Sequence, residues 1–348
     1  MANKSILIIG PYPPPPGGVS IHVQRLEKLL IKEGFYVDIA NVNKHYHSNY
    51  NKNIFNIDRL RKLIFIDYSN YDIVHIHYMS PESTFLIFLL TLFKKNKLII
   101  SFHNERIFGE ILKYKILFKI ISNKIHKVII AREDIRNKLL QMNIFHPDKV
   151  VTILPFIKPA KDKKTDSDYE SFEDQQIFFQ EHNPIIFTYA NRLDYFNGKE
   201  MYGLDFIIDF IDYISKDHPN IGLYLKTPYP NNKFKRYIEK LMKNNNLEGS
   251  VYWSCESDNI INIISKCDIY IRPTETDGDS VLLREALYLG VKCIASDVIN
   301  RPEGCLIYSN RNIQDLEQVF YSCLNNPSVN TYNLQNDSSL KLIEVYNN

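Results

Sequence analysis

Short apolar runs alternate with longer amphipathic runs along the first part of the chain. Residues 5–10 (SILIIG) form a short apolar run that ends at a turn, which is typical of a buried strand in a parallel sheet. Residues 20–34 instead place their apolar side chains at helical spacing, and Gly34 marks the end of this predicted helix. Further strand-like runs follow at FYVDIANV, YDIVHIHY, KLIISFHN, KVIIAR and KVVTILPF. The alternation predicts an α/β domain with a doubly wound parallel sheet over residues 1–157.

The pattern breaks at residues 158–182. This stretch is polar and highly charged and has no periodicity, so we interpret it as a linker and the start of a second domain. A second alternation of strands and helices begins at PIIFTYANRL and predicts another Rossmann-like domain over residues 183–332. Ligands of open parallel sheets bind beyond the carboxyl ends of the strands. Two such domains that face each other would therefore enclose a cleft.

Composition and charge fit a globular protein of about two domains. The chain has 348 residues, of which 45% are apolar and 24% charged. Its net charge of +2 conceals an asymmetry, since residues 1–150 carry 22 Lys and Arg against 12 Asp and Glu, and the remainder carries 20 against 28. The basic half either meets an anionic surface or carries scattered, solvated lysines. It has no nucleic-acid-binding motif, so we expect no nucleic acid partner.

The cysteines and the longest apolar run indicate in which cellular compartment the protein is expected. All five cysteines lie in the second half without a C-x-x-C pair, which favours buried thiols in a reducing cytoplasm. The start of the chain lacks the features of a signal peptide, so we expect none. Residues 83–93 (STFLIFLLTLF) are too few to span a bilayer and predict a buried or interfacial helix.

Carboxylates cluster where a predicted strand (DIYIRP) gives way to a predicted helix (SVLLREALYLG). Asp277 and Asp279 lie in the turn, and Glu285 lies between the first and second turns of the helix. Asp279 is a candidate N-cap. A D-x-D metal site is one interpretation, but the positive end of the helix dipole disfavours a cation there. A purely structural cap is another.

A third interpretation of the acidic turn is a grip on sugar hydroxyls, and we favour it. Carboxylates are strong acceptors for hydroxyl donors. The backbone N–H groups of Ser280, Val281 and Leu282 open the helix, where a phosphate is stabilised. A sugar beside a diphosphate is what a nucleotide sugar presents, so the turn predicts a nucleotide-sugar site.

The same stretch resembles the acid-x7-acid signature of the retaining GT-B glycosyltransferases of family 4. In RPTETDGDSVLLREALYLGVKCIASDV, Asp277 falls at the first acid and Glu285 at the second. The resemblance implies that Glu285 holds the ribose hydroxyls and that Asp277 contacts the donor sugar. Gly278 and Asp279 would belong to the same donor loop. The chain differs in having Asp for the first Glu, and Asp279 and Ser280 where the family has Phe-Gly.

Other segments resemble the same family. PPPPGGVSIHVQRL resembles its N-terminal glycine-rich loop, which implies that the backbone at Gly17 and Gly18 approaches the donor. SFHN places His103 where the family has a donor-site histidine. YANRLDYFNGKEMYGLDFII resembles the segment that supplies the diphosphate cations, which implies that role for Arg192 and Lys199, although Tyr202 stands at the aligned lysine. SLKLIEVYNN resembles the family's closing helix, over residues 333–348.

The strand DIVHIHY also resembles the family. His75 and His77 alternate along it and therefore point to one face. A zinc site would need further spaced ligands, so we interpret the two histidines as a packed core pair.

The resemblance implies a function. We expect a retaining, metal-independent transferase that moves a hexose or N-acetylhexosamine from a nucleoside diphosphate sugar, UDP-linked, to a glycan hydroxyl. The expected catalytic residues are Asp277, His103, Arg192 and Lys199, and no cofactor is required. The DGD turn with ASDV and RPEG resembles bacterial surface-polysaccharide enzymes, which implies O-antigen or capsule assembly.

The acceptor and two rival functions remain open. ILKYKILFKIISNKIHK mixes lysines with apolar residues, which suits either an anionic membrane surface or a core-packed helix with solvated lysines. The membrane interpretation predicts a polyprenyl-diphosphate-linked acceptor at the inner face of the cytoplasmic membrane. The rivals are a nucleotide-sugar 2-epimerase of the same fold and a non-catalytic nucleotide-sugar-binding protein. A nicotinamide dehydrogenase is disfavoured because GPYPPPPGGV lacks G-x-G-x-x-G.

Overall fold

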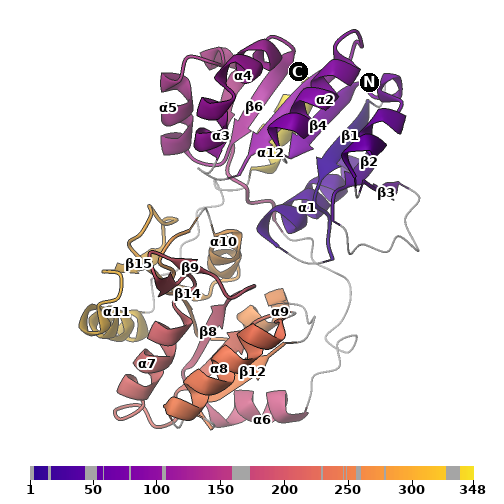
Figure 1. The fold of residues 1–348 in the computed structure, drawn as a ribbon. Helices are drawn as coiled ribbons and strands as arrows, with labels where there is room; N and C mark the ends of the chain where they lie inside the picture. Colours follow the sequence, from indigo (N-terminus) through magenta and orange to yellow (C-terminus); the bar gives the residue numbers. More distant parts are fainter. Residues whose placement is uncertain are drawn as a thin grey trace. The chain divides into compact units, whose positions relative to one another are not determined.

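A computed structural model of the protein describes most of the chain, which divides into two compact units. Unit 1 comprises Met1–Ala160 and Leu334–Asn348, and unit 2 comprises Lys161–Asn333 (Figure 1). The described residues are 4–14, 17–43, 53–57, 59–77, 80–103, 107–158, 173–228, 230–245, 247, 249–255, 260–277, 280–326 and 338–348.

Unit 1 is built on a seven-stranded parallel sheet with the order β3-β2-β1-β4-β5-β6-β7. The order changes direction between β1 and β4, so this is the point where neighbouring strands lead to opposite sides of the sheet. The strands are β1 (Ser5–Gly10), β2 (Tyr36–Asn41), β3 (Ile54–Asn56), β4 (Ile73–His77), β5 (Lys97–Phe102), β6 (Ile125–Ile130) and β7 (Val150–Thr152).

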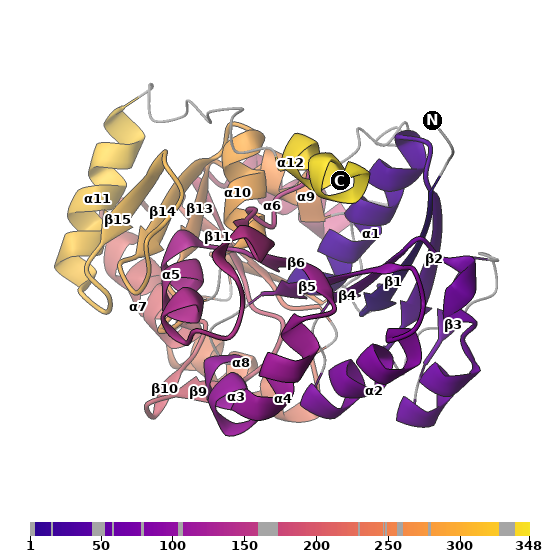
Figure 2. The ribbon, with the colours of Figure 1, turned by 90° about the horizontal axis from the view of Figure 1, so that it is seen from above.

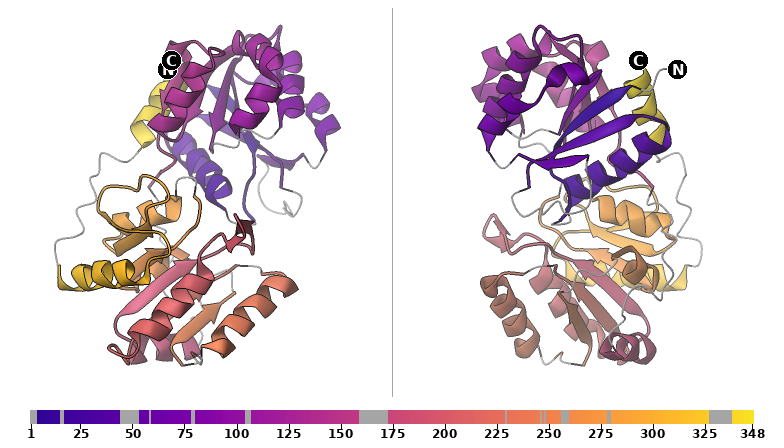
Figure 3. Two further views of the ribbon diagram at one scale, coloured as in Figure 1. Left: turned by 60° about the vertical axis from the view of Figure 1, so that its left-hand side comes forward. Right: turned by 90° about the vertical axis from the view of Figure 1, so that its right-hand side faces the viewer.

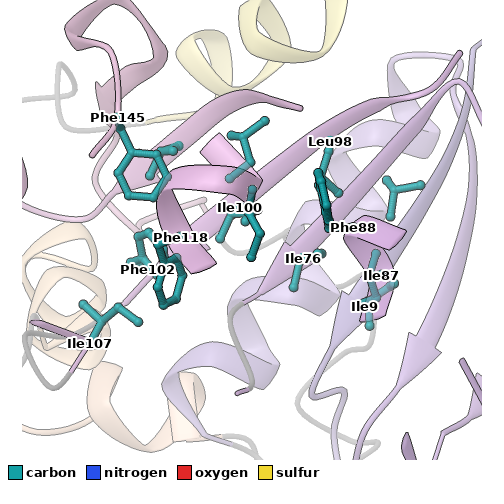
Figure 4. Close-up of a cluster of buried hydrophobic side chains, with 14 of the residues drawn as sticks. Ile9, Ile76, Ile87, Phe88, Leu98, Ile100, Phe102, Ile107, Phe118 and Phe145 are labelled. Carbon is teal, nitrogen blue, oxygen red and sulfur yellow. The ribbon is translucent and has the colours of Figure 1, made fainter. Parts of the chain in front are cut away.

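Helices cover both faces of this sheet (Figure 2). Alternate residues of β1 point to opposite faces, so Ile6 and Ile8 pack with α1 and α12 while Leu7 and Ile9 pack with α2 to α5. Figure 4 shows the second of these clusters, in which Ile87 and Phe118 meet the strands. The helices are α1 (Gly18–Lys32), α2 (Pro81–Thr91), α3 (Ile107–Lys113), α4 (Lys115–Ser122), α5 (Glu133–Gln141) and α12 (Ser339–Asn347), with short 3₁₀ helices at η1 (Leu60–Phe65), η2 (Tyr68–Asn70) and η3 (Pro147–Lys149).

Unit 2 repeats this plan with six parallel strands in the order β12-β11-β8-β13-β14-β15. Its change of direction lies between β8 and β13. The strands are β8 (Ile185–Tyr189), β11 (Gly222–Lys226), β12 (Val251–Ser254), β13 (Ile269–Arg272), β14 (Lys292–Ser296) and β15 (Cys305–Tyr308). A separate antiparallel hairpin pairs β9 (Tyr195–Phe196) with β10 (Lys199–Glu200).

The helices of unit 2 also form two layers (Figure 3). The apolar cores show that α7, α8 and α11 cover one face of the sheet, and α6, α9 and α10 cover the other. The helices are α6 (Glu173–Glu181), α7 (Leu204–Ile214), α8 (Asn232–Asn244), α9 (Ile260–Ser265), α10 (Val281–Tyr288) and α11 (Ile313–Asn325). The predicted fold class, with two doubly wound parallel-sheet units, is thus confirmed.

The boundaries of some elements differ from the sequence predictions. The basic segment after β5 is two helices, α3 and α4, because the backbone leaves the helical conformation at Tyr114 (φ −113°, ψ 33°). Within the segment predicted as a linker, residues 173–181 form α6, since Phe178 packs into the core of unit 2. The predicted strand KVVTILPF narrows to β7, and the chain then continues as an irregular segment.

Candidate functional site

The change of strand direction in unit 2 brings together two segments that the sequence marks for chemistry. Strand β8 leads to Asn191 and Arg192, and its neighbour β13 leads to Asp277 and then to α10. Ligands of doubly wound sheets bind at such a point, beyond the carboxyl ends of the strands. The topology therefore places the candidate donor residues at the edge of the sheet where a ligand is expected.

Asp277 is held by two arginines. Nε and Nη2 of Arg272 lie 2.8 and 3.0 Å from its two carboxylate oxygens, and Nη1 of Arg301 lies 2.8 Å from Oδ2. All three side chains are almost fully buried. Burial alone would raise the pKa of Asp277, but the two guanidinium groups outweigh it and hold the pKa well below its usual range. Asp277 is therefore a permanently charged member of a buried ion-pair triad.

Arg301 also ties this triad to β14. Its Nε donates to the carbonyl of Ser296 at 2.8 Å, and its Nη2 donates to the hydroxyls of Ser296 and Thr274 at 3.0 and 3.1 Å. The hydroxyl of Ser296 in turn donates to the carbonyl of Thr274 at 2.7 Å. The triad thus ties Thr274 and Asp277, which precede α10 in the chain, to the end of β14. The predicted contact of Asp277 with a donor sugar stays a prediction.

Tyr202 connects the loop after β8 to the triad. Its hydroxyl donates to the side-chain oxygen of Asn191, and its ring centroid lies 5.8 Å from Cζ of Arg272. Arg192 lies next to Asn191, where its half-exposed side chain pairs with Asp194 at 3.1 Å. The predicted diphosphate cation is therefore accessible on this loop.

Lys199 and Glu275 belong to a second charged network. Nζ of Lys199 is half-exposed and lies 4.0 Å from a carboxylate oxygen of Glu275. Glu275 is buried, accepts from Asn310 at 2.9 Å and pairs with Arg311, which also pairs with Asp205 at 2.7 Å. The structure thus separates the two acids at either end of the ETD sequence. Glu275 meets Lys199 and Arg311, while Asp277 meets Arg272 and Arg301.

Helix α10 begins one residue later than the candidate cap. Ser280, in an extended conformation, is the N-cap, and its hydroxyl accepts from the N–H of Leu283 at 3.2 Å. The prediction of Asp279 as the cap is therefore wrong, because Ser280 satisfies the first turn. Gly278 and Asp279 lie outside the described residues. The N–H groups of Val281 and Leu282 stand in the first turn, ahead of the first intrahelical hydrogen bond. Glu285 lies one turn further on and is buried.

The start of α7 lies in close backbone contact with the residue that follows β13. Gly203 caps α7 with a left-handed backbone (φ +69°), and a Cβ built on it would overlap the carbonyl oxygen of Pro273. Only glycine permits both the conformation and the contact. This contact holds the start of α7 against the residue that follows β13.

In unit 1, the glycine-rich loop leads directly into α1. Gly17 is the N-cap, and its N–H donates to the hydroxyl of Ser20 at 2.8 Å. Among the described residues, a Cβ built on Gly18 would meet nothing within 4 Å, and one on Gly17 would meet only the Ser20 hydroxyl at 3.7 Å. Packing among the described residues of unit 1 does not require these glycines, so the space that those residues leave beside the backbone is consistent with the approach of a ligand.

His103 belongs to a cluster of four histidines at the carboxyl ends of β4 and β5. Its Nε2 lies 2.9 Å from Nδ1 of His77, and the two rings are stacked. The ring of His22, from α1, lies 5.5 Å from that of His77 and 5.6 Å from that of His103. His75 completes the cluster, with its ring 4.4 Å from that of His77. The structure confirms that His75 and His77 are buried side by side.

Burial keeps this cluster neutral. It lowers the pKa of His22 to about 4 and that of His103 to about 3, and it lowers those of His75 and His77 well below the usual value. Nδ1 of His22 donates to the carbonyl of Pro155 at 3.0 Å. Since a carbonyl only accepts, Nε2 of His22 carries no proton and remains a hydrogen-bond acceptor.

The cluster has no arrangement that suits a metal ion. His75 is bound through Nδ1 to the hydroxyl of Tyr346 and through Nε2 to that of Ser101 at 2.8 Å. Within the described part of the chain, no group of three or more His, Cys, Asp or Glu side chains converges on a common point.

Sequence reasoning missed several residues of these networks. Arg272 ends β13 and Arg301 lies between β14 and β15. Each precedes a proline, in IRPTE and NRPEG, and this repeated Arg-Pro pair was the signal that the sequence offered. His22 is followed by Val23 and Leu26 on the buried face of its helix, which marks it as a buried histidine.

Two family models together match nearly the whole chain. Residues 16–161 match Glycosyltransferase Family 4, and residues 171–332 match Glycosyl transferases group 1. The chain belongs to the GT-B glycosyltransferases of the family 4 type. The boundary between the two matches falls close to that between units 1 and 2. A search of curated proteins found no match to this glycosyltransferase.

Solved structures share the fold at low sequence identity. A glycosyltransferase from Rickettsia africae is 17% identical, with a TM-score of 0.69 over 100% of this chain and 94% of that one. HepE of Anabaena, solved with UDP-glucose, is 12% identical, with a TM-score of 0.68 over 98% and 94% of the two chains. Sucrose-phosphate synthase of Thermosynechococcus elongatus is 16% identical, with a TM-score of 0.68 over 99% and 98%. These matches establish the fold of this glycosyltransferase.

The described helices of this glycosyltransferase bear on whether the chain could cross a membrane. None of those described has the length and apolar character that a membrane span requires.

Proposed function

We propose that this glycosyltransferase moves a hexose or N-acetylhexosamine from a UDP-linked sugar to a hydroxyl of a glycan acceptor. The observation that carries the proposal is the end of β13, where Asp277 and Glu285 stand on either side of the start of α10. A buried carboxylate and free N–H groups at one helix start suit a ribose and a diphosphate together. UDP as the nucleotide of the donor is supported by HepE, which was solved with UDP-glucose.

In this proposal the residues of unit 2 hold the donor. Glu285 accepts hydrogen bonds from the ribose hydroxyls, and the N–H groups of Val281 and Leu282 meet the diphosphate. Arg192 and Lys199 are half-exposed, so they can turn toward the same phosphates. Their positive charge stabilises the leaving diphosphate, which is where negative charge develops in the transition state. This charge makes a metal ion unnecessary.

The transfer itself exchanges one bond for another. The bond between the anomeric carbon and the phosphate oxygen breaks, and a bond to the acceptor oxygen forms on the same face of the sugar. The acceptor proton passes to the departing phosphate, so no protein nucleophile takes part. Retention of configuration is proposed from the resemblance of the acid-x7-acid motif to retaining enzymes. His103, which burial keeps neutral, would hydrogen-bond the donor without adding charge.

The proposed acceptor rests on the charge of unit 1, and the proposed biological setting rests on a resemblance of the acidic turn in unit 2. We propose a polyprenyl-diphosphate-linked glycan at the inner face of the cytoplasmic membrane, in O-antigen or capsule assembly. The support is the basic excess of residues 1–150 and the resemblance of the DGD turn to surface-polysaccharide enzymes. A 2-epimerase would instead isomerise the donor without an acceptor, and a binding protein would do neither.

A donor panel tests the proposal. UDP-, GDP- and dTDP-sugars are screened by thermal shift, and nucleotide release is then assayed with the best binder in the presence of EDTA and lipid-linked acceptors. We expect UDP-sugars alone to stabilise the protein and release to survive EDTA. Isomerisation of the donor without release would establish the epimerase, and binding without either reaction would establish a sensor. The absence of any nucleotide binding would overturn the whole assignment.

A further inference from the structure

One side of unit 1 exposes an unusual number of large apolar side chains. Phe93 is 94% exposed, Phe65 is 84% exposed and Ile116 is 80% exposed, although each lies within or next to a helix that packs on the sheet. We call this set the apolar face. Its members are Ile64, Phe65, Leu89, Leu92, Phe93, Leu112, Ile116 and Ile120.

The elements that carry the apolar face lie side by side. At one end of α2, Glu82 accepts from the hydroxyl of Tyr114, which precedes α4, at 3.4 Å. At the other end, Nζ of Lys124 donates to the carbonyl of Lys94 at 2.7 Å. Helices α2 and α4 therefore run parallel, and η1 packs against α2. Figure 2 shows α2, α3 and α4 along the same side of the unit. Their inner residues form the core, so their outer residues share one surface.

Lysines accompany the exposed apolar residues along the chain. Four of them have a lysine as a direct neighbour, in the pairs Phe93–Lys94, Leu112–Lys113, Lys115–Ile116 and Lys119–Ile120. Residues 81–95 and 107–124 together carry six lysines and two glutamates, a net charge of +4. The apolar face is therefore strongly basic at its rim.

The combination of exposed apolar side chains and lysines indicates which kind of partner the apolar face binds. Protein interfaces are depleted in lysine, and a second copy of the same basic surface would be repelled by like charge. A bilayer with anionic headgroups accommodates both features, because apolar side chains enter the acyl boundary while lysines reach up to the headgroups. Exposed large apolar side chains gathered on the outer side of one helix layer also mark a site of interaction.

We infer that the apolar face of unit 1 docks on an anionic lipid bilayer. The inference gives the proposed lipid-linked acceptor a physical route to the enzyme, and to that extent it rests on the proposed function. The docking itself depends only on exposed side chains and charge. Phe93 and Ile116 would enter the bilayer, and the neighbouring lysines would hold the surface against it.

Vesicle binding by the full chain tests the inference. The protein is sedimented with vesicles of phosphatidylcholine alone or mixed with phosphatidylglycerol, at low and high salt. We expect binding to the anionic vesicles only, and release by salt. The double variant Phe93→Ser with Ile116→Ser should bind at least about tenfold more weakly. Lys113→Gln with Lys115→Gln and Lys119→Gln should also lose about tenfold or more, since each lysine near an anionic surface strengthens binding by about fivefold.

Matched controls lie on the opposite face of the same sheet. Leu340 on α12 is 79% exposed, almost as much as Ile116, and Leu340→Ser should leave binding unchanged. Lys28→Gln with Lys32→Gln on α1 is the corresponding control for charge. Equal loss in the controls, or equal binding to neutral vesicles, would overturn the inference. A dimer that Phe93→Ser dissociates, without vesicle binding, would assign the face to a second copy.

The two proposals fail separately. Docking is read from sedimentation, which needs neither donor nor acceptor. Nucleotide binding with no affinity for vesicles would overturn only the membrane-docking inference. Vesicle binding with no nucleotide binding would overturn only the proposed nucleotide-sugar site.

Discussion

Both carboxylate oxygens of Asp277 are bound by Arg272, at 2.8 and 3.0 Å. With Arg301 on the same carboxylate, this buried charge is a structural support as well as a candidate ligand. Removal of one partner from a buried ion pair leaves the other uncompensated, which typically costs about 3–5 kcal/mol.

Asp277→Asn should therefore lower the free energy of unfolding of unit 2 by about 3 kcal/mol or more. Urea titration followed by the fluorescence of Trp253, the single tryptophan of the chain, measures it. Asp194→Asn removes an exposed pair and should cost less than about 1 kcal/mol. If Asp277→Asn left unfolding unchanged and abolished transfer, the carboxylate would act on the substrate alone.

Glu285→Gln should weaken donor binding without unfolding the protein. The amide keeps the size of the side chain but loses the charge that favours two ribose hydroxyls, so the donor KM should rise about tenfold. Steady-state kinetics over a range of donor concentrations, with thermal unfolding in parallel, separates the two effects. Glu239→Gln, on the exposed side of α8, is the control. An unchanged KM would refute the role of Glu285.

Gly203→Ala should be far more harmful than Gly198→Ala. Both glycines have positive φ, +69° and +79°, so alanine strains the backbone equally, by about 1–2 kcal/mol. Only at Gly203 would the new Cβ also overlap the carbonyl of Pro273. We expect Gly203→Ala to cost more than about 4 kcal/mol and to displace the loop before α10. Chemical unfolding of the pair checks this, and equal losses would contradict the close approach.

Unit 1 should lose stability in mild acid. The pKa of each clustered histidine is lowered on folding, so the unfolded chain takes up protons first as the pH falls below about 6.5. Stability is therefore lost as the pH falls from about 6.5 to the pKa of the folded state, which is about 4 for His22 and about 3 for His103. Within this window each histidine costs about 1.4 kcal/mol per pH unit.

Two spectroscopic probes separate this effect from that of unit 2. Trp253 lies in unit 2, whereas far-UV circular dichroism reports both units. Urea midpoints between pH 7 and pH 5 should fall more steeply by circular dichroism than by fluorescence. His103→Asn should make the decline shallower. Parallel declines for both probes would show that the histidines do not carry the effect.

Much of the fold was predictable from the sequence because its signals are local. The apolar run of β1 and the helical spacing of α1 each lie within a few residues, and their repetition along the chain predicts the sheets. The break at Tyr114 was not predictable, because apolar periodicity continues across it. The helix at residues 173–181 was not predictable either, because the segment is mostly polar and only Gln175 and Phe178 of this helix are buried.

The site was predictable only where its residues are neighbours along the chain. The turn from Asp277 to Glu285 carries its own signal. Arg301 follows the neighbouring strand β14, so its pairing with Asp277 depends on β14 lying beside β13 in the folded sheet. His22 is likewise distant from His77 in sequence, and α1 brings them together. Long-range pairs of this kind are set by packing, which no local pattern encodes.

Tyr346 on α12 meets His75 in the core of unit 1, and its carbonyl accepts from Lys4 at 3.0 Å. All of unit 2 lies between these partners along the chain. A ribosome therefore releases the whole of unit 2 before it releases the helix that completes unit 1. The first unit to be made is the last to be finished, and until then the surface of its sheet beside α1 stands open to chaperones and to water.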